Sequence, residues 1–306
     1  MNFVLLNSGH VMPKLGLGTY RVKAYDILKN VVEAALLSGY RLFDTAESYG
    51  NEQTLGKIFE EILPKYNLKR SDIFLTSKLA PQSQGPNAYQ SVLNSCKNLK
   101  TDYIDLYLIH WPGTSKLKPD DHKNKESRIA SWSCLEQMVK EGRLKNIGVS
   151  NFNINHLENL VTNCTIKPAV NQVEFHPYIY QTQKKLLAYC QSPNLNIQLQ
   201  SYSSLGGQNI DSKETTVQNQ LLNDSTLLSL AKNNHFAKNP AQILLKWSIQ
   251  HGSCVIPKSI HQSRVESNAK IFDFELTSQE IAILDDIRIR ENKKDVRFCW
   301  DPSEVV

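Results

Sequence analysis

Residues 39–52 read GYRLFDTAESYGNE, and later parts of the chain repeat the pattern found there. Aromatic and aliphatic residues at 40–43 are typical of a β-strand, which ends abruptly at Asp44. The chain then becomes polar, and Tyr49 stands beside a Gly50-Asn51 turn signal. An aspartate in such a place is usually a helix cap or a turn former. If later strands end in the same way, the carboxylate and the phenol would share one pocket.

Strand-like and helix-like segments alternate along the chain. The predicted strands are 14–20, 40–44, 72–78, 104–110, 145–151, 169–175, 196–203 and 253–259. The predicted helices are 24–38, 51–63, 87–99, 127–141, 153–162, 181–191, further helices before 250, then 261–270 and 277–288. Eight strands separated by helices predict an α/β protein with a closed (β/α)8 TIM barrel. An N-terminal β-hairpin at 3–12 precedes the barrel, and a short C-terminal loop follows it.

A doubly wound open sheet is the alternative fold. The glycines of KLGLGTY (14–20) do not form a GxGxxG loop, and no other phosphate-binding glycine loop occurs, which weakens that alternative. The chain contains no linker rich in proline, glycine or serine. Residues 1–306 are therefore predicted to form a single domain, a size common for barrels of this kind.

Composition excludes several classes of function. The net charge is only +5, and basic residues alternate with acidic ones, as in KLKPDDHKNKE (116–126), which predicts a solvated loop and no nucleic-acid partner. No apolar run is long enough for a membrane span and no signal peptide is evident, so the predicted location is cytoplasmic. The six cysteines form no CxxC pair and the eight histidines form no ligand cluster, which predicts reduced thiols and no metal.

Polar or ionisable residues stand at the ends of the apolar strands. They are Asp44, Lys78, His110, Ser150, Asn151, Gln172, Tyr202 and Lys258. Singly, His110 has the ordinary interpretation of a hydrogen-bonded core histidine, and Lys78 that of a rim lysine. Because active sites of barrels form at the carboxyl ends of the strands, the whole set predicts one site at that face.

The side chains at this face suggest a reaction. An ammonium beside a phenol would stabilise the phenolate and lower the pKa of Tyr49, and Asp44 would orient the ammonium of Lys78. The phenol would then protonate a developing alkoxide, while a neutral His110 would orient the carbonyl oxygen. No side chain donates hydride, so the same chemistry predicts a nicotinamide cofactor.

Seven ordered motifs resemble those of the aldo-keto reductases over essentially the whole chain. They are GYRLFDTAESYGNE (39–52), LTSKL (75–79), LIHWP (108–112), KNIGVSNF (145–152), NQVEFHPY (171–178), SYSSLG (201–206) and VIPKSIHQSRVESN (255–268). The resemblance implies a barrel that binds NADPH in extended form and reduces small aldehydes and ketones to alcohols. It implies the catalytic tetrad Asp44, Tyr49, Lys78 and His110, with Tyr49 as the proton donor.

The resemblance also implies cofactor contacts and a substrate pocket. Ser150, Asn151 and Gln172 would hold the carboxamide, Tyr202 would stack on the nicotinamide, and Ser203 and Leu205 would contact the pyrophosphate. Lys258, Ser259 and Arg264 would bind the 2′-phosphate, Asn268 would contact the adenine, and Thr19 and Asp44 would also face the cofactor. The pocket residues would be Tyr20, Tyr49, His110, Trp111, Cys299 and Trp300.

Four positions depart from common family residues: Ser267 for Glu, His261 for Thr, Gly207 for Ser, and Ala80 for Trp. The first three bear on cofactor affinity, whereas Ala80 would open one wall of the pocket. Short loops resemble those of glyoxal- and aldehyde-reducing members more than those of steroid-specific ones. The family is usually monomeric.

Two other functions remain open for this sequence. One is a cofactor-binding module without turnover, as in channel-associated β subunits or lens crystallins of the same fold; the intact tetrad speaks against it. The other is reduction of a prostaglandin endoperoxide or a similar compound by the same residues.

Overall fold

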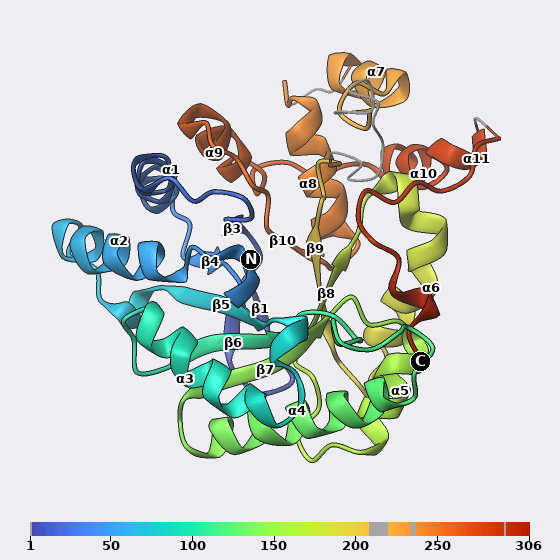
Figure 1. Cartoon of the computed structure of the whole chain (residues 1–306). Helices are drawn as coiled ribbons and strands as arrows, with labels where there is room; N and C mark the ends of the chain where they lie inside the picture. The colour runs from blue at the N-terminus through green and yellow to red at the C-terminus, as the bar shows by residue number, and fades with distance from the viewer. Residues whose placement is uncertain (1, 208–219, 234–236, 291) are drawn as a thin grey trace.

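The computed structural model describes residues 2–207, 220–233, 237–290 and 292–306. Its strands are β1 Phe3–Leu5, β2 Val11–Pro13, β3 Gly16–Gly18, β4 Leu42–Asp44, β5 Phe74–Leu79, β6 Ile104–Ile109, β7 Leu144–Ser150, β8 Val170–Glu174, β9 Gln198–Tyr202 and β10 Cys254–Val255. Its α-helices are α1 Tyr25–Leu37, α2 Glu52–Lys65, α3 Ala88–Asn98, α4 Lys123–Lys140, α5 Ile154–Thr162, α6 Tyr180–Cys190, α7 Ser225–Asn233, α8 Pro240–Gln250, α9 Gln262–Ala269, α10 Ser278–Asp285 and α11 Ile287–Arg290. Helices surround the strands (Figure 1).

Strands β3 to β10 form one parallel sheet in which each strand pairs with the next along the chain. Two parallel bridges, Leu15 with Val255 and Gly18 with Lys258, connect the two ends of this sheet. The bridges close the sheet into a barrel, which confirms the (β/α)8 prediction and excludes the open doubly wound sheet.

The two glycines of β3 allow the barrel to close. A Cβ atom on Gly16 would lie 2.1 Å from Leu42 Cδ2, and one on Gly18 would lie 2.7 Å from the carbonyl oxygen of Ile256. A side chain at Gly18 would therefore collide with the backbone beside β10. The glycines of KLGLGTY therefore serve close strand packing in this chain.

The predicted N-terminal hairpin is present as antiparallel β1 and β2. Its Leu6 and Met12 side chains are buried with residues from the amino ends of barrel strands, including Leu42, Phe74 and Val170. The hairpin therefore closes the end of the barrel opposite the carboxyl ends of the strands. Those carboxyl ends are left for a site.

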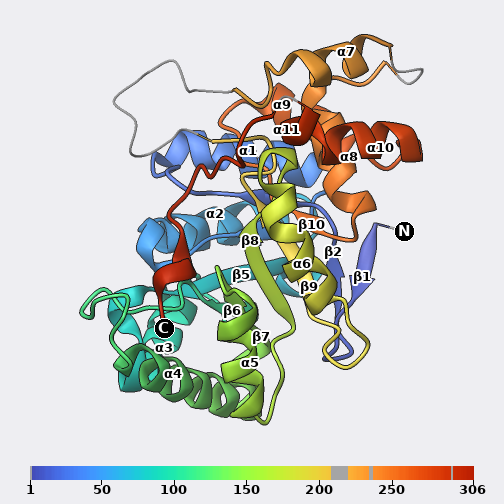
Figure 2. The same cartoon turned by 90° about the vertical axis from the view of Figure 1, so that its right-hand side faces the viewer.

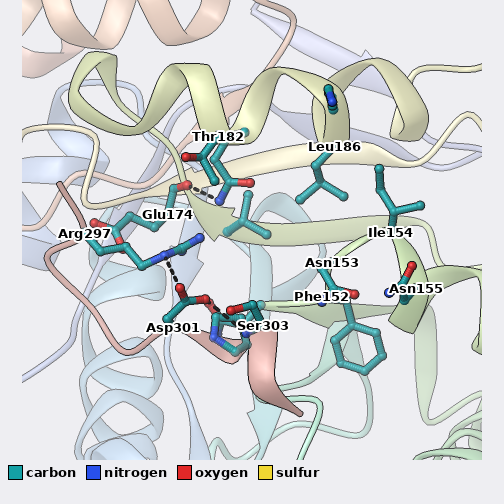
Figure 3. A pocket seen from close by; sticks show the side chains of 15 residues that line it. Phe152, Asn153, Ile154, Asn155, Glu174, Thr182, Leu186, Arg297, Asp301 and Ser303 are labelled. Atoms are coloured by element: carbon teal, nitrogen blue, oxygen red, sulfur yellow. Dashed lines mark hydrogen bonds and ion pairs between the residues drawn. The ribbon is translucent and has the colours of Figure 1, made fainter. Parts of the chain in front are cut away.

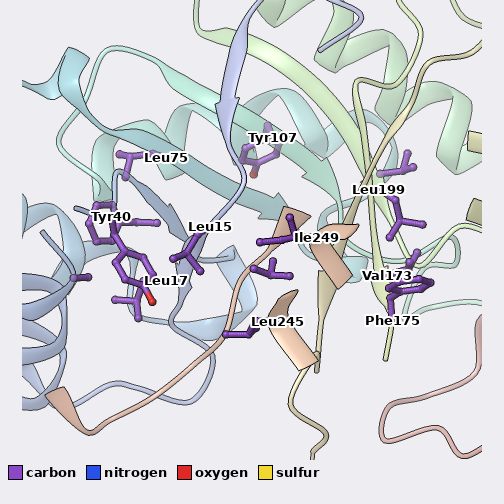
Figure 4. Close-up of a cluster of buried hydrophobic side chains, with 14 of the residues drawn as sticks. Leu15, Leu17, Tyr40, Leu75, Tyr107, Val173, Phe175, Leu199, Leu245 and Ile249 are labelled. Carbon is purple, nitrogen blue, oxygen red and sulfur yellow. The ribbon is translucent and has the colours of Figure 1, made fainter. Parts of the chain in front are cut away.

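A second and larger apolar core lies between the sheet and the helices, and Figure 4 shows part of it. Its buried members include Leu17, Leu75 and Leu199 on the strands and Leu245 on α8. Burial of apolar surface on this scale is the main force that holds the helices on the barrel.

Helix α4 begins at Lys123, four residues before the predicted start at 127. The prediction of a loop over 116–126 was wrong at its end, where the chain is helical and Asn124 faces inward, whereas His122, Lys123 and Glu126 are exposed. Asn124 is buried; its Oδ1 accepts from the backbone N–H of Thr114, and its Nδ2 donates to the carbonyl of Lys118. Polar groups that serve the backbone in this way look like surface residues in a sequence.

Two predicted elements are shorter or divided. Strand β10 covers Cys254–Val255 only, because Pro257 has no N–H group to continue the pairing. The helix predicted over 277–288 is divided into α10 and α11 at Asp286. Both differences concern boundaries and leave the order of elements unchanged.

The C-terminal segment, red in Figures 1 and 2, leaves α11 and passes the ends of β8 and β9 before it reaches α5. Val296 donates its backbone N–H to the carbonyl of Tyr178 at 2.9 Å. Near the end, the Nε2 atom of His156 lies 2.6 Å from the carbonyl oxygen of Val305, and Arg128 Nη1 donates to that of Val306 at 2.8 Å. The segment thus lies across the open face of the barrel.

Candidate active site

Three ionisable side chains meet where β4 and β5 end. Asp44 is the last residue of β4, Lys78 lies near the end of β5, and both are buried. Lys78 Nζ lies 2.6 Å from Asp44 Oδ1 and 3.2 Å from the hydroxyl oxygen of Tyr49. It also donates to the carbonyl of Thr45 at 2.8 Å. One ammonium therefore connects a carboxylate to a phenol.

Tyr49 lies on a single 3₁₀ turn, Glu47–Tyr49, that a carboxylate holds in place. Glu47 Oε2 accepts from the backbone N–H of Ala80 at 3.0 Å and from the hydroxyl of Ser91 at 2.7 Å. Its Oε1 accepts from Ser83 at 2.7 Å. Sequence reasoning missed Glu47, although its place two residues before Tyr49 was visible. The network fixes the turn against the loop after β5.

His110 follows β6 and faces the same site. Its ring centroid lies 5.7 Å from that of Tyr49, and its Nδ1 lies 3.3 Å from the hydroxyl of Ser48. Burial lowers the pKa of His110 well below its usual range, and the nearby Lys78 ammonium lowers it further. The imidazole is therefore neutral at physiological pH.

The pKa of Tyr49 differs from the expectation. Burial raises it well above its ordinary value, and the Asp44 carboxylate raises it further, although the sequence argument expected Lys78 to lower it. Burial lowers the pKa of Lys78 itself, against the opposing effect of Asp44. Desolvation of the phenol is the larger effect here, so Tyr49 keeps its proton at neutral pH.

Gln172 on β8 joins this cluster. Its Nε2 donates to Asp44 Oδ2 at 2.8 Å and to Gln200 Oε1 at 2.8 Å, and all three residues are buried. Asp44 therefore binds Lys78 through one oxygen and Gln172 through the other. Neither this bridge nor the part played by Gln200 was predicted from the sequence. The inward-facing glutamine two residues before Tyr202 was the available signal.

Three further strand-end residues form one hydrogen-bond chain. Asn151, in a left-handed conformation with φ 65°, donates through Nδ2 to the carbonyl of His110 at 3.0 Å and to Ser150 Oγ at 3.1 Å. The hydroxyl of Tyr202 donates to Asn151 Oδ1 at 2.7 Å. Ser150 Oγ donates to the carbonyl of Gln172 at 2.8 Å. This group lies at the carboxyl ends of β7 and β9, whereas Lys78 lies on β5.

The same barrel occurs in known proteins. A family model described as the aldo/keto reductase family matches residues 14–289. The chain belongs to the aldo-keto reductases. It is 38% identical to a glyoxal reductase of Bacillus subtilis (strain 168), covering 99% of this chain and 97% of the relative. It is 35% identical to an NADH-dependent D-xylose reductase of Candida parapsilosis, covering 99% and 96%.

A solved structure is also similar. The crystal structure of a Bombyx mori aldo-keto reductase in complex with NADP matches with a TM-score of 0.84 at 32% identity, covering 97% of this chain and 94% of that one. The resemblance drawn from the motifs is thus confirmed. This aldo-keto reductase is an oxidoreductase that acts on carbonyl groups with a nicotinamide cofactor.

Residues predicted to contact the cofactor backbone lie near the mouth of this aldo-keto reductase. Ser203 has a left-handed φ of 51°, and Leu205 packs partly on the large core. Thr19 is buried, and its hydroxyl donates to the carbonyl of Asp44 at 2.8 Å. Thr19 therefore supports the loop of Asp44 directly.

The residues predicted to bind the 2′-phosphate and the adenine lie around α9. Lys258 and Arg264 are exposed, whereas Ser259 and Asn268 are buried. Ser259 Oγ accepts from the backbone N–H of His261 at 3.0 Å, so the hydroxyl shapes the turn into the helix. His261 precedes α9 and makes no side-chain cap bond.

Two departures from common family residues have local explanations. Ser267 Oγ accepts from Asn239 Nδ2 at 2.9 Å, which ties α9 to the start of α8. A Cβ atom on Gly207 would lie 3.0 Å from Phe298 Cβ, so the glycine allows the C-terminal segment to approach the loop after β9. In this aldo-keto reductase both positions serve contacts between elements.

Aromatic side chains gather at the opening. The Tyr20 ring lies 5.0 Å from the Tyr49 ring, and the Trp111 ring lies 5.0 Å from that of Trp300. Trp111 also stacks on His110 at 6.2 Å. The structure therefore brings the aromatic side chains of the predicted pocket beside Tyr49 and His110.

No helix in the described ranges is long and apolar enough to cross a membrane. Over those same ranges, no three histidine, cysteine, aspartate or glutamate side chains come together as a metal site.

Proposed function

We propose that this aldo-keto reductase reduces small aldehydes and ketones to alcohols with NADPH, and that Tyr49 is the proton donor. The contact of Lys78 Nζ with both Asp44 and the Tyr49 hydroxyl carries this proposal. A phenol paired with a buried ammonium has few structural uses, because burying an ion pair is costly for stability. A role in proton transfer accounts for keeping this ion pair beside the phenol despite the loss of stability.

The residues present fit a nicotinamide nucleotide with a 2′-phosphate. Lys258 and Arg264 are exposed cations at the start of α9, and neither has an ion-pair partner in the part of the chain that the structure describes. A lysine, an arginine and a helix N-terminus together suit a dianionic phosphate. We assign the 2′-phosphate to these residues with Ser259, and the adenine to Asn268.

We assign the nicotinamide end to the opposite side of the mouth. Ser150, Asn151 and Gln172 would hold the carboxamide, Tyr202 would stack on the ring, and Ser203, Leu205 and Thr19 would lie along the rest of the cofactor. The polar ends of Asn151 and Gln172 are already oriented by Tyr202 and Asp44. When bound, the nucleotide supplies the hydride for the carbonyl carbon.

The chain's own residues handle the proton and the carbonyl oxygen. Tyr49 donates its hydroxyl proton to that oxygen, and the Lys78 ammonium stabilises the phenolate that remains. Asp44 holds Lys78 in place through the contact at 2.6 Å. If the Ser48 hydroxyl donates to Nδ1 of neutral His110, the proton of Nε2 is left to orient the carbonyl oxygen.

The substrate pocket is assigned to Tyr20, Tyr49, His110, Trp111, Cys299 and Trp300. The experiment is NADPH and NADH oxidation, followed at about 340 nm, with glyoxal, phenylglyoxal, nitrobenzaldehyde, a sugar aldehyde and a steroid ketone. Turnover with NADPH well above NADH is the expected result. Tight NADPH binding without turnover would favour a cofactor-binding module. The absence of both NADPH binding and turnover would overturn the proposal.

Replacing Arg264 with glutamine is expected to weaken NADPH binding by about tenfold to a hundredfold, because a charged hydrogen bond to the phosphate is lost. The Kd for NADH should change little, since NADH lacks that phosphate. Fluorescence titration with both nucleotides measures the two constants. Arg290→Gln, which removes an exposed arginine from α11, is the matched control. Equal weakening of NADPH and NADH binding would contradict the assignment.

The raised pKa of Tyr49 predicts opposite pH profiles for the two directions of reaction. Reduction uses the protonated phenol, which a raised pKa preserves, so kcat/KM for reduction should stay nearly constant from about pH 6 to pH 9. Alcohol oxidation uses the phenolate, so its rate should rise about tenfold per pH unit over that range. If the oxidation rate instead stops rising at a pH below about 8, the Lys78 ammonium lowers the pKa of Tyr49 more than burial raises it once ligands are bound.

The monomeric state, the cytoplasmic location, the absence of a nucleic-acid partner and the single domain over 1–306 remain predictions from the sequence. Size-exclusion chromatography with light scattering would test the first of them.

A further inference from the structure

Glu174 is a buried carboxylate at the barrel mouth for which the proposed mechanism has no use. It is the last residue of β8, it pairs in register with Tyr202 of β9, and it is 1% exposed. Buried carboxylates are rare unless several donors satisfy them. The donors of Glu174 therefore indicate its purpose.

Two of these donors are successive backbone amides of the C-terminal segment. Glu174 Oε1 accepts from the N–H of Phe298 at 2.6 Å, and Oε2 accepts from the N–H of Cys299 at 3.3 Å. The Nε2 atom of His176 lies 2.9 Å from Oε1. A single carboxylate thus binds the segment to the end of β8.

On one side the segment is packed, and on the other it borders a cavity. The Phe298 side chain is buried, and its ring lies 4.9 Å from that of His176. Beside it lies a cavity of about 310 Å³, which Figure 3 shows between this segment, α5 and α6. The segment residues on the cavity side, Arg297 and Asp301, bind each other at 3.5 Å. Along the cavity, polar contacts of this kind add to the packing of Phe298.

Cys299 and Trp300, at and after the backbone amides that Glu174 binds, extend toward the predicted pocket. Cys299 Sγ lies 3.8 Å from Ser203 Oγ, and the Trp300 ring lies 5.0 Å from that of Trp111. Trp300 is 49% exposed, and its ring packs against that of Trp111. A shift of the backbone at 298–299 would move both side chains relative to the carbonyl site.

We propose that Glu174 is a positioning residue that sets substrate selectivity. It holds the backbone of Phe298 and Cys299 so that Cys299 and Trp300 form one wall of the carbonyl pocket. The inference rests on the proposed function, since it concerns the same pocket. Bulky aromatic carbonyl compounds depend on this wall, because they contact Trp300 and Trp111 together. Glyoxal is too small to need it.

The test compares Glu174→Gln with Glu52→Gln. The side-chain amide introduced by Glu174→Gln has one acceptor oxygen where the carboxylate has two, and its NH2 group would face a backbone N–H. Glu52 is an equally buried glutamate that accepts from Ser77 at 2.6 Å and from Asn98 at 3.3 Å, away from the C-terminal segment. It controls for the loss of a buried charge.

The expected result is a selective change. For Glu174→Gln, KM for phenylglyoxal and nitrobenzaldehyde should rise about tenfold, whereas kcat and KM for glyoxal and the Kd for NADPH should stay within about twofold. Glu52→Gln should show no such difference between large and small substrates. Equal changes for all substrates in both variants, or no change in Glu174→Gln, would overturn the proposal.

Two further measurements cover a failure of the glutamine variant to fold. Glu174→Asp keeps the charge but withdraws the carboxylate, and it carries the same expectation. In the unmodified protein, amide hydrogen exchange at 298–299 should be slow, and fast exchange there would overturn the proposal. Lack of any carbonyl turnover by the unmodified protein would instead reject the proposed function itself, so the two failures are distinct.

Discussion

Tyr49→Phe is expected to lower kcat/KM for every carbonyl substrate by about 10²- to 10⁴-fold, the usual range for loss of a general acid. The phenylalanine ring keeps the packing against Tyr20 and His110, so only the hydroxyl is lost. Steady-state kinetics with NADPH measures the change. The Kd for NADPH and the unfolding temperature should remain close to those of the unmodified protein.

Tyr103→Phe is the matched control. Tyr103 immediately precedes β6, at the end of that strand opposite His110, and no described group bonds to its hydroxyl. Its replacement should leave kcat within about twofold. Equal losses in the two variants, or turnover by Tyr49→Phe near that of the unmodified protein, would reject Tyr49 as the proton donor.

Lys78→Met is expected to damage both activity and stability. Removing the ammonium leaves the buried Asp44 carboxylate without its ion-pair partner, and such losses lower the free energy of unfolding by about 3–5 kcal/mol. In the proposed mechanism it also removes the charge that stabilises the phenolate of Tyr49, so kcat should fall by a factor of about 10² or more. Urea unfolding and steady-state kinetics measure the two effects.

Lys246 provides the comparison. Its side chain is 3% exposed, but its partner Glu275 is 71% exposed, so Lys246→Met leaves a carboxylate that water can solvate. That variant should retain activity and lose much less stability than Lys78→Met. The double variant Asp44→Asn with Lys78→Met should recover part of the stability and none of the activity. Equal destabilisation by the two lysine variants would contradict this account of Asp44.

The barrel could be predicted because strand-like and helix-like segments alternate and most strands end at a polar residue, a pattern that depends only on local sequence. The start of α4 could not, because Asn124 is polar yet buried against backbone groups. The bridge from Asp44 through Gln172 to Gln200 depends on the register between distant strands. The direction of the Tyr49 pKa shift depends on how much burial opposes Lys78, which the order of residues does not show.

Residues outside the Asp44 cluster also differ in how far local sequence reveals them. Lys258 and Arg264 could be proposed as a pair because one motif places them close together in the sequence. Glu174 stood in a motif too, but its partners are backbone amides about 125 residues away, and backbone donors carry no residue signature. Contacts of this kind appear only once the chain is folded.

The four tryptophans fall into two pairs whose fluorescence reports on different parts of the protein. Trp132 and Trp247 are enclosed in the core, whereas Trp111 and Trp300 stand at the mouth. The enclosed pair should emit at shorter wavelength and resist collisional quenchers until the barrel melts. The mouth pair should be quenched readily and respond to occupants of the pocket. Quencher-resolved emission would thus separate unfolding of the barrel from events at its opening.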